Sequence, residues 1–235
     1  TERDEARVMP RRAHWIKDAV AEFRPEENCV VTQSGQRVSY DWLVVAAGIK
    51  IDWDGIRGLR ESIGKEGVCT NYDRRYVEST WETLKNFRGG TAIFTQPQGA
   101  IKCGGAPQKI MYLADDYLRR TGVRDRSRVI FAAPGSSIFG IEKYRKPLEE
   151  VVARRGIETL FRRDLQEIRP ATREAVFKNL DTGEEEVLTY DMLHVTPPMG
   201  PPDFIAQSPL ADAEGWVDVD KYTLQHTRLI GRASC

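Results

Sequence analysis

Two stretches of the chain repeat one pattern, and this repeat decides the fold class. The first is EFRPEENCVVTQSGQRVSYDWLVVAAG, Glu22–Gly48, and the second is EIRPATREAVFKNLDTGEEEVLTYDMLHVTPP, Glu167–Pro198. Each has two strand-like runs, a polar turn with glycine, a third strand-like run, Tyr-Asp and a final apolar run. The turns Ser-Gly-Gln and Asp-Thr-Gly-Glu favour hairpins because glycine tolerates positive φ. The repeat therefore predicts two β-meanders, and the alternative is that two unrelated meanders look alike by chance.

The last apolar run of the first copy predicts a buried strand. Residues Leu43–Ala47 include too few polar side chains to alternate between a solvent-exposed and a buried face. Such a run is typical of a strand that is covered on both faces. We therefore expect a strand over Leu43–Ala47.

A βαβαβ pattern precedes the second copy. Strands are predicted over Thr91–Thr95, Val129–Ala133 and Ile157–Phe161. The apolar residues between them recur at helical spacing, which predicts two amphipathic helices; the positions are Ile110, Leu113, Ala114, Tyr117 and Leu118, then Tyr144, Leu148, Val151 and Val152. This half of the chain is typical of a Rossmann-like domain followed by a meander.

The first copy has its meander but no βαβ half before it, so we expect residue 1 to fall inside a domain and the chain to be a fragment. The predicted fold class is α/β, with tandem Rossmann-like domains of the glutathione-reductase-like, FAD/NAD(P)-binding plan. Each would have a three-layer ββα plus β-meander arrangement, the first being incomplete. The expected division is an incomplete part of the FAD-binding domain over 1–85, a second Rossmann-like domain over 86–200, and a truncated return to the first domain over 201–235.

Composition limits the function classes. The 235 residues are 40% hydrophobic, enough for a sizeable core. Lysine and arginine together number 35, as do aspartate and glutamate, so no basic excess points to nucleic acid. No apolar run approaches the ~20 residues of a membrane span, although peripheral attachment stays open. The four cysteines form no CxxC pair and the histidines lie in unlike contexts, so no metal site is expected.

The loop after the first βαβ strand is QPQGAIKCGGAP, residues 96–107. A dinucleotide-binding unit would carry a Gly-x-Gly-x-x-Gly phosphate turn here. Pro97 and Cys103 stand in that place instead, so NAD(P) binding by this domain is doubtful. The sequence indicates that this loop has another task.

Cys103 has a setting that favours the thiolate. Pro107 suits the first turn of a helix, so Cys103 should lie just ahead of a helix N-terminus, with Lys102 and Lys109 close in sequence. These features lower a cysteine pKa from about 8.5 towards roughly 3.5–7.5. Gly104 and Gly105 would let a second body, such as a flavin ring, approach closely. The structural alternative is that Cys103 is a small buried apolar residue.

Several stretches resemble sulfide:quinone oxidoreductases of the mitochondrial type. They are IKCGGAPQKIMYL (Ile101–Leu113), IFGIEKY (Ile138–Tyr144), EAVFKNLDTGE (Glu174–Glu184), YDMLHVTPPMGPPD (Tyr190–Asp203) and GWVDVDKYTLQH (Gly215–His226). The resemblance extends from about Trp15 to His226.

The resemblance implies an FAD enzyme that is peripherally attached to the mitochondrial inner membrane, or to a bacterial cytoplasmic membrane, and oxidises hydrogen sulfide. In this family sulfide attacks a disulfide or trisulfide of two redox cysteines, which gives a persulfide and a thiolate. Electrons pass through FAD to ubiquinone, and the sulfane sulfur passes to glutathione, sulfite or cyanide. Cys103 matches one redox cysteine, in agreement with its thiolate-favouring context.

The resemblance also implies FAD-contacting residues. Val20 matches a position at the adenine end, and Ala46, Ala47 and Gly48 match a small-residue strand end beside the FAD. Lys109 matches a lysine near the flavin, where its charge would stabilise reduced anionic flavin.

The departures from the family bear on activity. The resemblance places the second redox cysteine beyond this chain; Cys29 and Cys69 match neither redox cysteine, and Cys235 is not assigned to that role. The N-terminal glycine fingerprint and a later flavin-binding motif are also missing, so we expect no turnover by this chain. The alternatives are another FAD-dependent pyridine nucleotide-disulfide oxidoreductase or NADH dehydrogenase relative, and a non-catalytic fragment.

Two further groups have a structural interpretation. His194 is expected as a hydrogen-bonded core histidine, and the alternative is that it faces the flavin or the quinone. Four arginines, Arg119, Arg120, Arg124 and Arg126, are expected as a solvated helix end.

Overall fold

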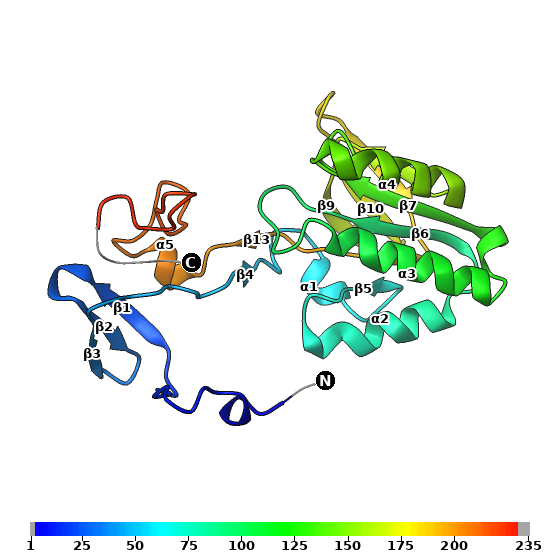
Figure 1. Cartoon of the computed structure of the whole chain (residues 1–235). Helices are drawn as coiled ribbons and strands as arrows, with labels where there is room; N and C mark the ends of the chain where they lie inside the picture. The colour runs from blue at the N-terminus through cyan, green and yellow to red at the C-terminus, as the bar shows by residue number, and fades with distance from the viewer. Residues whose placement is uncertain (1–2, 230–235) are drawn as a thin grey trace. The chain divides into compact units, whose positions relative to one another are not determined.

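The computed structural model describes residues 3–229, and its contacts divide the chain into two units (Figure 1). One unit is the segment up to Gly48 together with the segment from Pro201 onward, and the other is Ile49–Gly200. Residues 49–85, which the sequence analysis assigned to the first domain, belong to the second unit. The reason is pairing: the strand β5 (Val68–Cys69) lies parallel to β12 (Met192–His194) at the edge of the larger sheet.

The second unit is built on a parallel sheet of five strands in the order β5-β12-β6-β7-β8. The strands not yet given are β6 (Gly90–Thr95), β7 (Ser127–Ala133) and β8 (Glu158–Phe161). All three strands that the βαβαβ pattern predicts are therefore present. The apolar end of the second repeat, β12, lies between β5 and β6 and is buried, as a run without alternation requires.

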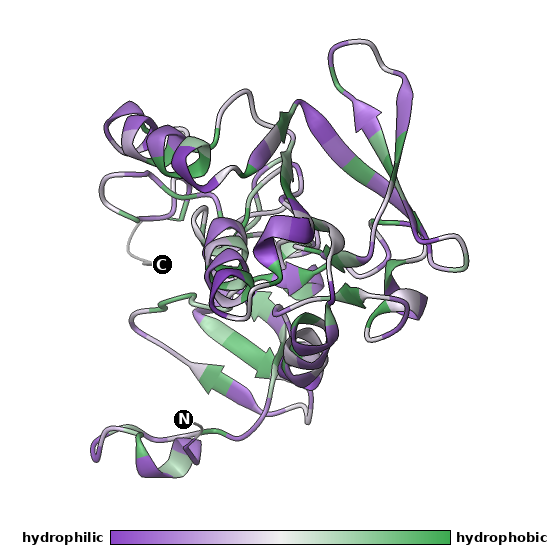
Figure 2. Ribbon diagram, turned by 90° about the vertical axis from the view of Figure 1, so that its right-hand side faces the viewer, coloured by the Kyte–Doolittle hydropathy of each residue, from purple (hydrophilic) through white to green (hydrophobic). Residues whose placement is uncertain are grey.

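Helices cover one face of this sheet. They are α2 (Arg74–Asn86), α3 (Ala106–Arg120) and α4 (Glu142–Arg155), and both predicted helical stripes lie within α3 and α4. Alternate strand residues such as Phe94 and Phe131 point into this helical layer. In Figure 2 the helices carry hydrophilic and hydrophobic residues side by side, as helices with one buried face do.

The antiparallel meander covers the other face. Its strands are β9 (Arg163–Arg169), β10 (Glu174–Asn179) and β11 (Glu185–Thr189), with β10 in the middle. Ile93 and Ile130, which neighbour Phe94 and Phe131 in sequence, pack on this side together with the short helix α1 (Leu59–Ser62). The turn between β10 and β11 uses Gly183 at φ 80°, the conformation that the hairpin reading predicts. A two-stranded ribbon of β4 (Lys50–Ile51) and β13 (Met199–Gly200) completes the unit.

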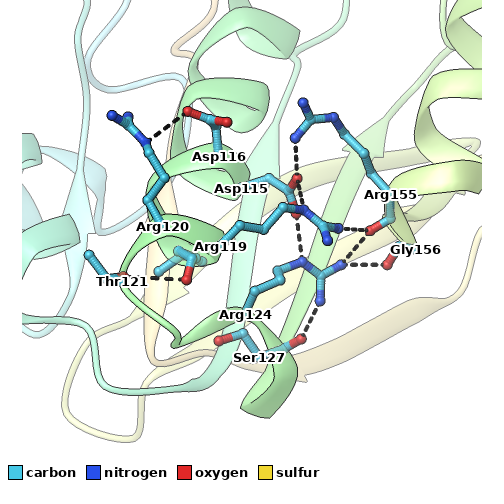
Figure 3. Close-up of polar contacts among 10 residues, drawn as sticks. Asp115, Asp116, Arg119, Arg120, Thr121, Arg124, Ser127, Arg155 and Gly156 are labelled. Atoms are coloured by element: carbon cyan, nitrogen blue, oxygen red, sulfur yellow. Dashed lines mark hydrogen bonds and ion pairs between the residues drawn. The ribbon is translucent and has the colours of Figure 1, made fainter.

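Three arginines fix α3 to its surroundings through one buried carboxylate (Figure 3). The Asp115 side chain is fully buried, and the Nε of Arg119, the Nε of Arg124 and the Nη1 of Arg155 lie 2.9, 2.5 and 2.7 Å from its oxygens. Arg124 also donates to the carbonyls of Arg155 and Gly156, at the end of α4. The expectation of a solvated helix end is therefore wrong for Arg124, whose side chain is 13% exposed because Asp115 and the end of α4 accept its hydrogen bonds, whereas the Arg119 side chain stays 42% exposed.

The first unit has a smaller core. Its antiparallel sheet has the order β1-β2-β3, with β1 Val20–Arg24, β2 Cys29–Thr32 and β3 Arg37–Ser39. The short helix α5 (Asp203–Ala206) packs on β1, where the rings of Phe23 and Phe204 stack at 5.9 Å. Three 3-10 turns complete the described elements of the chain, at Glu5–Arg7, Pro25–Glu27 and Arg124–Arg126.

The expected strand over Leu43–Ala47 is not formed. This segment pairs with no strand within residues 3–229, and Val44 is 62% exposed while Val45 is buried. A continuous apolar run is stable as a strand only between neighbours that take its backbone hydrogen bonds and cover both faces. The described part of the first unit covers one side alone. Within residues 3–229 there is also no helix with the length and apolarity needed to span a membrane.

Candidate functional site

The loop between β6 and α3 presents Cys103 directly before the helix. The Cys103 carbonyl accepts a hydrogen bond from the Ala106 amide at 3.0 Å, which closes the loop onto the first turn. Gly105 is the N-cap residue of α3 and supplies no side-chain cap. The Gly105 amide hydrogen bond to the sulfur lowers the pKa of the Cys103 thiol, and the charge of Lys109 lowers this pKa further. The half-buried sulfur therefore tends towards thiolate.

Lys109 lies on the first turn of α3 and reaches back to the cysteine. Its Nζ is 3.7 Å from Cys103 Sγ. A lysine in a first helical turn is unfavourable for the helix dipole, and an adjacent thiolate offsets this cost. The pair forms one local electrostatic unit.

The two glycines after the cysteine are not required by this chain's own packing. A Cβ on Gly104 would lie 3.6 Å from the Phe139 ring, and a Cβ on Gly105 would lie 3.9 Å from Lys109 Cε. Both are ordinary contacts, and Gly105 has φ −93°. The surface beside Cys103 is therefore open to a second molecule.

A cavity of 260 Å³ lies at the carboxyl ends of β5 and β12, next to this pair. Its polar lining residues are Asn71, Tyr72, Lys102, Lys109 and His194. His194 is completely buried and stacks on Phe94, with ring centroids 5.9 Å apart. Within residues 3–229 neither ring nitrogen has a hydrogen-bond partner, so the expectation of a hydrogen-bonded core histidine is wrong in its second part. Burial lowers the pKa of His194 to about 4, so its ring is neutral at physiological pH.

The other cysteines have different settings. Cys29 and Cys69 are buried free thiols, and burial raises the pKa of Cys69 to about 12. A thiol of that kind is a poor nucleophile at neutral pH. Cys235 lies outside the described residues.

A larger cavity of 810 Å³ lies in the first unit. It is lined by Val20, Ala46 and Ala47, three of the residues that the resemblance assigns to FAD, together with Glu22 and Phe204 among others. Gly48 follows directly in the chain with φ +72°, and no atom lies within 4 Å of the position that a Cβ would take there. Small side chains on an exposed, extended backbone leave room for a flat ligand to approach the main chain.

The structure thus gathers the candidate residues into two groups, one in each unit. Cys103 and Lys109 form the first group, and Val20, Ala46 and Ala47 the second, with Gly48 beside it. The sequence analysis missed Tyr72 as a partner of the first group. A usable signal existed: Tyr72 and His194 follow or end strands whose carboxyl ends meet at one sheet edge, where ligands bind in open α/β sheets. In the described part of the chain, no three side chains of His, Cys, Asp or Glu are grouped so that they could hold a metal ion.

The sequence is similar to curated proteins of one kind. No protein-family model matches the chain. It is 47% identical over 222 residues to the mitochondrial sulfide:quinone oxidoreductase of Mus musculus, covering 94% of this chain and 49% of that protein. It is also 47% identical over 230 residues to the mitochondrial sulfide:quinone oxidoreductase of Dictyostelium discoideum, covering 97% of this chain and 50% of that protein. The chain therefore spans about half the length of the curated relatives it matches.

Solved structures share the fold. The sulfide:quinone oxidoreductase of Aquifex aeolicus superposes with a TM-score of 0.76 at 21% identity, over 93% of this chain and 51% of that chain. NDH2 of Plasmodium falciparum superposes with a TM-score of 0.62 at 12% identity, over 93% of this chain and 48% of that one. The fold is thus the α/β Rossmann-like fold of FAD- and NAD(P)-binding flavoproteins.

Proposed function

We propose that this chain is one part of a sulfide:quinone oxidoreductase of the mitochondrial type, with Cys103 as one of its two redox cysteines. The observation that carries the proposal is the placement of Cys103 and Lys109 where a nucleotide-binding domain would have its phosphate turn, together with 47% identity to two such enzymes. The whole enzyme would oxidise hydrogen sulfide and reduce ubiquinone.

The role of Cys103 in this reaction is that of a leaving thiolate. Hydrosulfide attacks the partner cysteine's sulfur in a Cys–S–S–Cys bond, the S–S bond breaks, and its electron pair stays on Cys103. The product on the partner is a persulfide. A leaving thiol of lower pKa leaves faster, and both the Gly105 amide and Lys109 lower the pKa of Cys103. The partner cysteine belongs, by resemblance, to a part of the enzyme beyond this chain.

FAD fits the first-unit cavity in size and in the character of its walls. Ligand pockets span roughly 300–1,000 Å³, and this cavity measures 810 Å³. Val20, Ala46, Ala47 and Gly48 would contact the cofactor through backbone and small side chains, and the family resemblance also assigns Lys109 of the second unit to the flavin. When bound, FAD would take up the two electrons and pass them to the quinone. The protein's own part is to hold the thiolate and to place positive charge beside it.

The remaining partners follow from the same proposal. The sulfane sulfur would pass to glutathione, sulfite or cyanide, and the enzyme would lie peripherally on the mitochondrial inner membrane. A bacterial cytoplasmic membrane is the alternative location. Nucleic acid is not among the proposed partners.

Two other functions compete with this one. Another FAD-dependent pyridine nucleotide-disulfide oxidoreductase or NADH dehydrogenase relative is supported by the fold shared with NDH2, but the loop around Cys103 lacks the phosphate turn that such an enzyme needs. A non-catalytic fragment is the other alternative, and a chimera that carries this chain without sulfide-dependent quinone reduction would support it.

A chimera tests the proposal. The matching half of the Mus musculus enzyme is replaced by this chain, and sulfide-dependent quinone reduction is measured. We expect activity in the chimera, none after Cys103→Ser, and little change after Cys29→Ser as the matched control. A chimera that carries FAD but oxidises NADH instead of sulfide, or that works equally well as Cys103→Ser, contradicts the proposal.

A further inference from the structure

The 260 Å³ cavity beside Cys103 has walls that are rich in hydrogen-bond donors. Five of its eight lining side chains can donate a hydrogen bond, and none of the eight is acidic. Two of the five, Lys102 and Lys109, are exposed ammonium groups. Ala106, Ile110 and Leu113 supply the apolar remainder. A site with two positive charges and further donors suits an anion.

The buried end of the cavity contains polar atoms that lack partners. Neither ring nitrogen of His194 has a hydrogen-bond partner within residues 3–229, whereas the buried Tyr72 hydroxyl interacts with the hydroxyl of nearby Thr196. An unsatisfied buried polar group costs about 1–3 kcal/mol, so the two nitrogens of His194 call for an explanation. A ligand that accepts from His194 would remove this cost, and the Tyr72 hydroxyl could donate to the same ligand. A neutral imidazole always has one N–H to donate.

Lys109 links the cavity to the thiol. Lys109 lines the cavity, and its Nζ is 3.7 Å from Cys103 Sγ. Burial raises the pKa of Tyr72, a hydrogen bond with Thr196 lowers it, and the charge of the Cys103 thiolate raises it further. A molecule in the cavity therefore lies one side chain away from the reactive sulfur.

We propose that this cavity is a binding subsite for a small oxyanion, held by Lys102 and Lys109 at the exposed side and by His194 and Tyr72 at the buried side. Donors on both sides favour an anion with several acceptor atoms over a single-atom anion such as chloride. The identity of the natural ligand rests on the proposed function. Of the three sulfur acceptors named there, sulfite is a small oxyanion, so we expect this subsite to bind sulfite as the acceptor.

The test measures protection of Cys103 in this chain, without flavin or sulfide. Iodoacetamide alkylates the chain while chloride is replaced by sulfate at constant ionic strength. The rate is read from the tryptic peptide Cys103–Lys109, which separates Cys103 from every other cysteine. We expect sulfate to slow alkylation saturably, whereas chloride over the same range has no saturable effect. Sulfate is the probe because sulfite itself reacts with iodoacetamide.

Substitutions in the cavity wall test whether sulfate protects Cys103 by binding in this cavity. His194→Leu should weaken sulfate protection by about tenfold or more, the loss of one hydrogen bond to a charged group, and His194→Gln should restore part of it. Tyr72→Phe removes a single oxygen and serves as the second variant if His194→Leu fails to fold. Lys65→Met is the matched control, because Lys65 lies before the amino end of β5, at the opposite sheet edge, and should leave protection unchanged.

Three results would overturn the subsite. One is no protection by sulfate, as expected if water alone fills the cavity. Another is equal protection by chloride, which would mean general screening. The third is undiminished protection in both His194→Leu and Tyr72→Phe, which would place the anion on the lysines outside the cavity. None of these results depends on sulfide oxidation, so the subsite and the proposed function fail separately.

Discussion

The Nζ of Lys109 lies 3.7 Å from the Sγ of Cys103, across the first turn of α3. Replacing the lysine, Lys109→Met, should raise the pKa of Cys103 and slow its alkylation at neutral pH, because one of the two main sources of thiolate stabilisation is lost. The Gly105 amide contributes more and remains, so the pKa should stay below that of an ordinary cysteine. Alkylation rate against pH measures the shift.

Salt provides the control for this pair. The larger part of the Lys109 contribution is Coulombic at an exposed site and the smaller part is a hydrogen bond to the sulfur, so ~1 M salt should reduce the difference between wild type and Lys109→Met. A difference that is undiminished at high salt would mean that the substitution acts through loop structure instead of charge.

Asp115 should be a major determinant of stability. Asp115→Asn leaves Arg119, Arg124 and Arg155 without their shared carboxylate, and the loss of one member of a buried ion pair costs about 3 kcal/mol or more. Urea unfolding of wild type and Asp115→Asn measures this cost. Asp116→Asn is the matched control: Asp116 and its partner Arg120 are exposed, so its effect should stay below about 1 kcal/mol. Equal effects of the two substitutions would contradict the structure.

The same carboxylate should link stability to acid. Burial alone would raise the pKa of Asp115, but its arginine hydrogen bonds hold the pKa below the ordinary value. A folded-state pKa that is depressed stabilises the protein above the unfolded pKa of about 3.9 and loses that contribution as the pH falls below it. Asp115→Asn should therefore be less sensitive to acid than wild type below about pH 4.

His194 should destabilise the fold in mild acid. Its pKa is lowered to about 4 by burial, so the unfolded chain takes up a proton between pH 6.5 and 4 while the folded chain does not. Stability should fall by up to about 3 kcal/mol across this window. His194→Phe should remove this dependence and can still stack on Phe94. The control His14→Asn removes an imidazole from an exposed position, and an equal effect there would contradict the assignment.

The boundary between the units predicts which pieces fold. Residues 49–200 contain a complete sheet with both faces covered, and this piece should unfold in urea in one cooperative transition. A piece that begins at residue 86 loses β5, α1 and most of α2, with the fully buried Leu59 and Val68. Each such side chain is worth about 2–5 kcal/mol, so the shorter piece should be unfolded. Equal stability of the two pieces would restore a boundary near residue 85.

Much of the second unit follows from its sequence. The strands around Ile93 and Ile130 and the helical stripes of α3 and α4 have strong periodicity, and their packing partners lie within the chain. The run Leu43–Ala47 has an equally apolar pattern, yet it forms no strand because nothing in the described part of the first unit covers its second side. The hydrophobic pattern indicates which residues are to be buried. Whether they form a strand depends on the neighbouring strands and on the elements that cover both faces.

The candidate site divides in the same way. The electrostatic setting of Cys103 could be predicted, because a helix N-terminus and a lysine one turn later are local in sequence. The unpartnered nitrogens of His194 and the fixing of Arg124 on Asp115 could not, because each depends on which long-range neighbours reach the side chain. The place of residues 49–85 in the second unit has the same cause: the pairing of β5 with β12 joins residues more than a hundred positions apart.

The most direct measurement of the central claim is the visible spectrum of the anaerobic chimera as sulfide is added without quinone. The account predicts bound flavin that bleaches with sulfide in the wild-type chimera and stays oxidised in Cys103→Ser. Bleaching that is undiminished in Cys103→Ser, or flavin that responds to NADH and not to sulfide, would show that Cys103 is not a redox cysteine of a sulfide:quinone oxidoreductase.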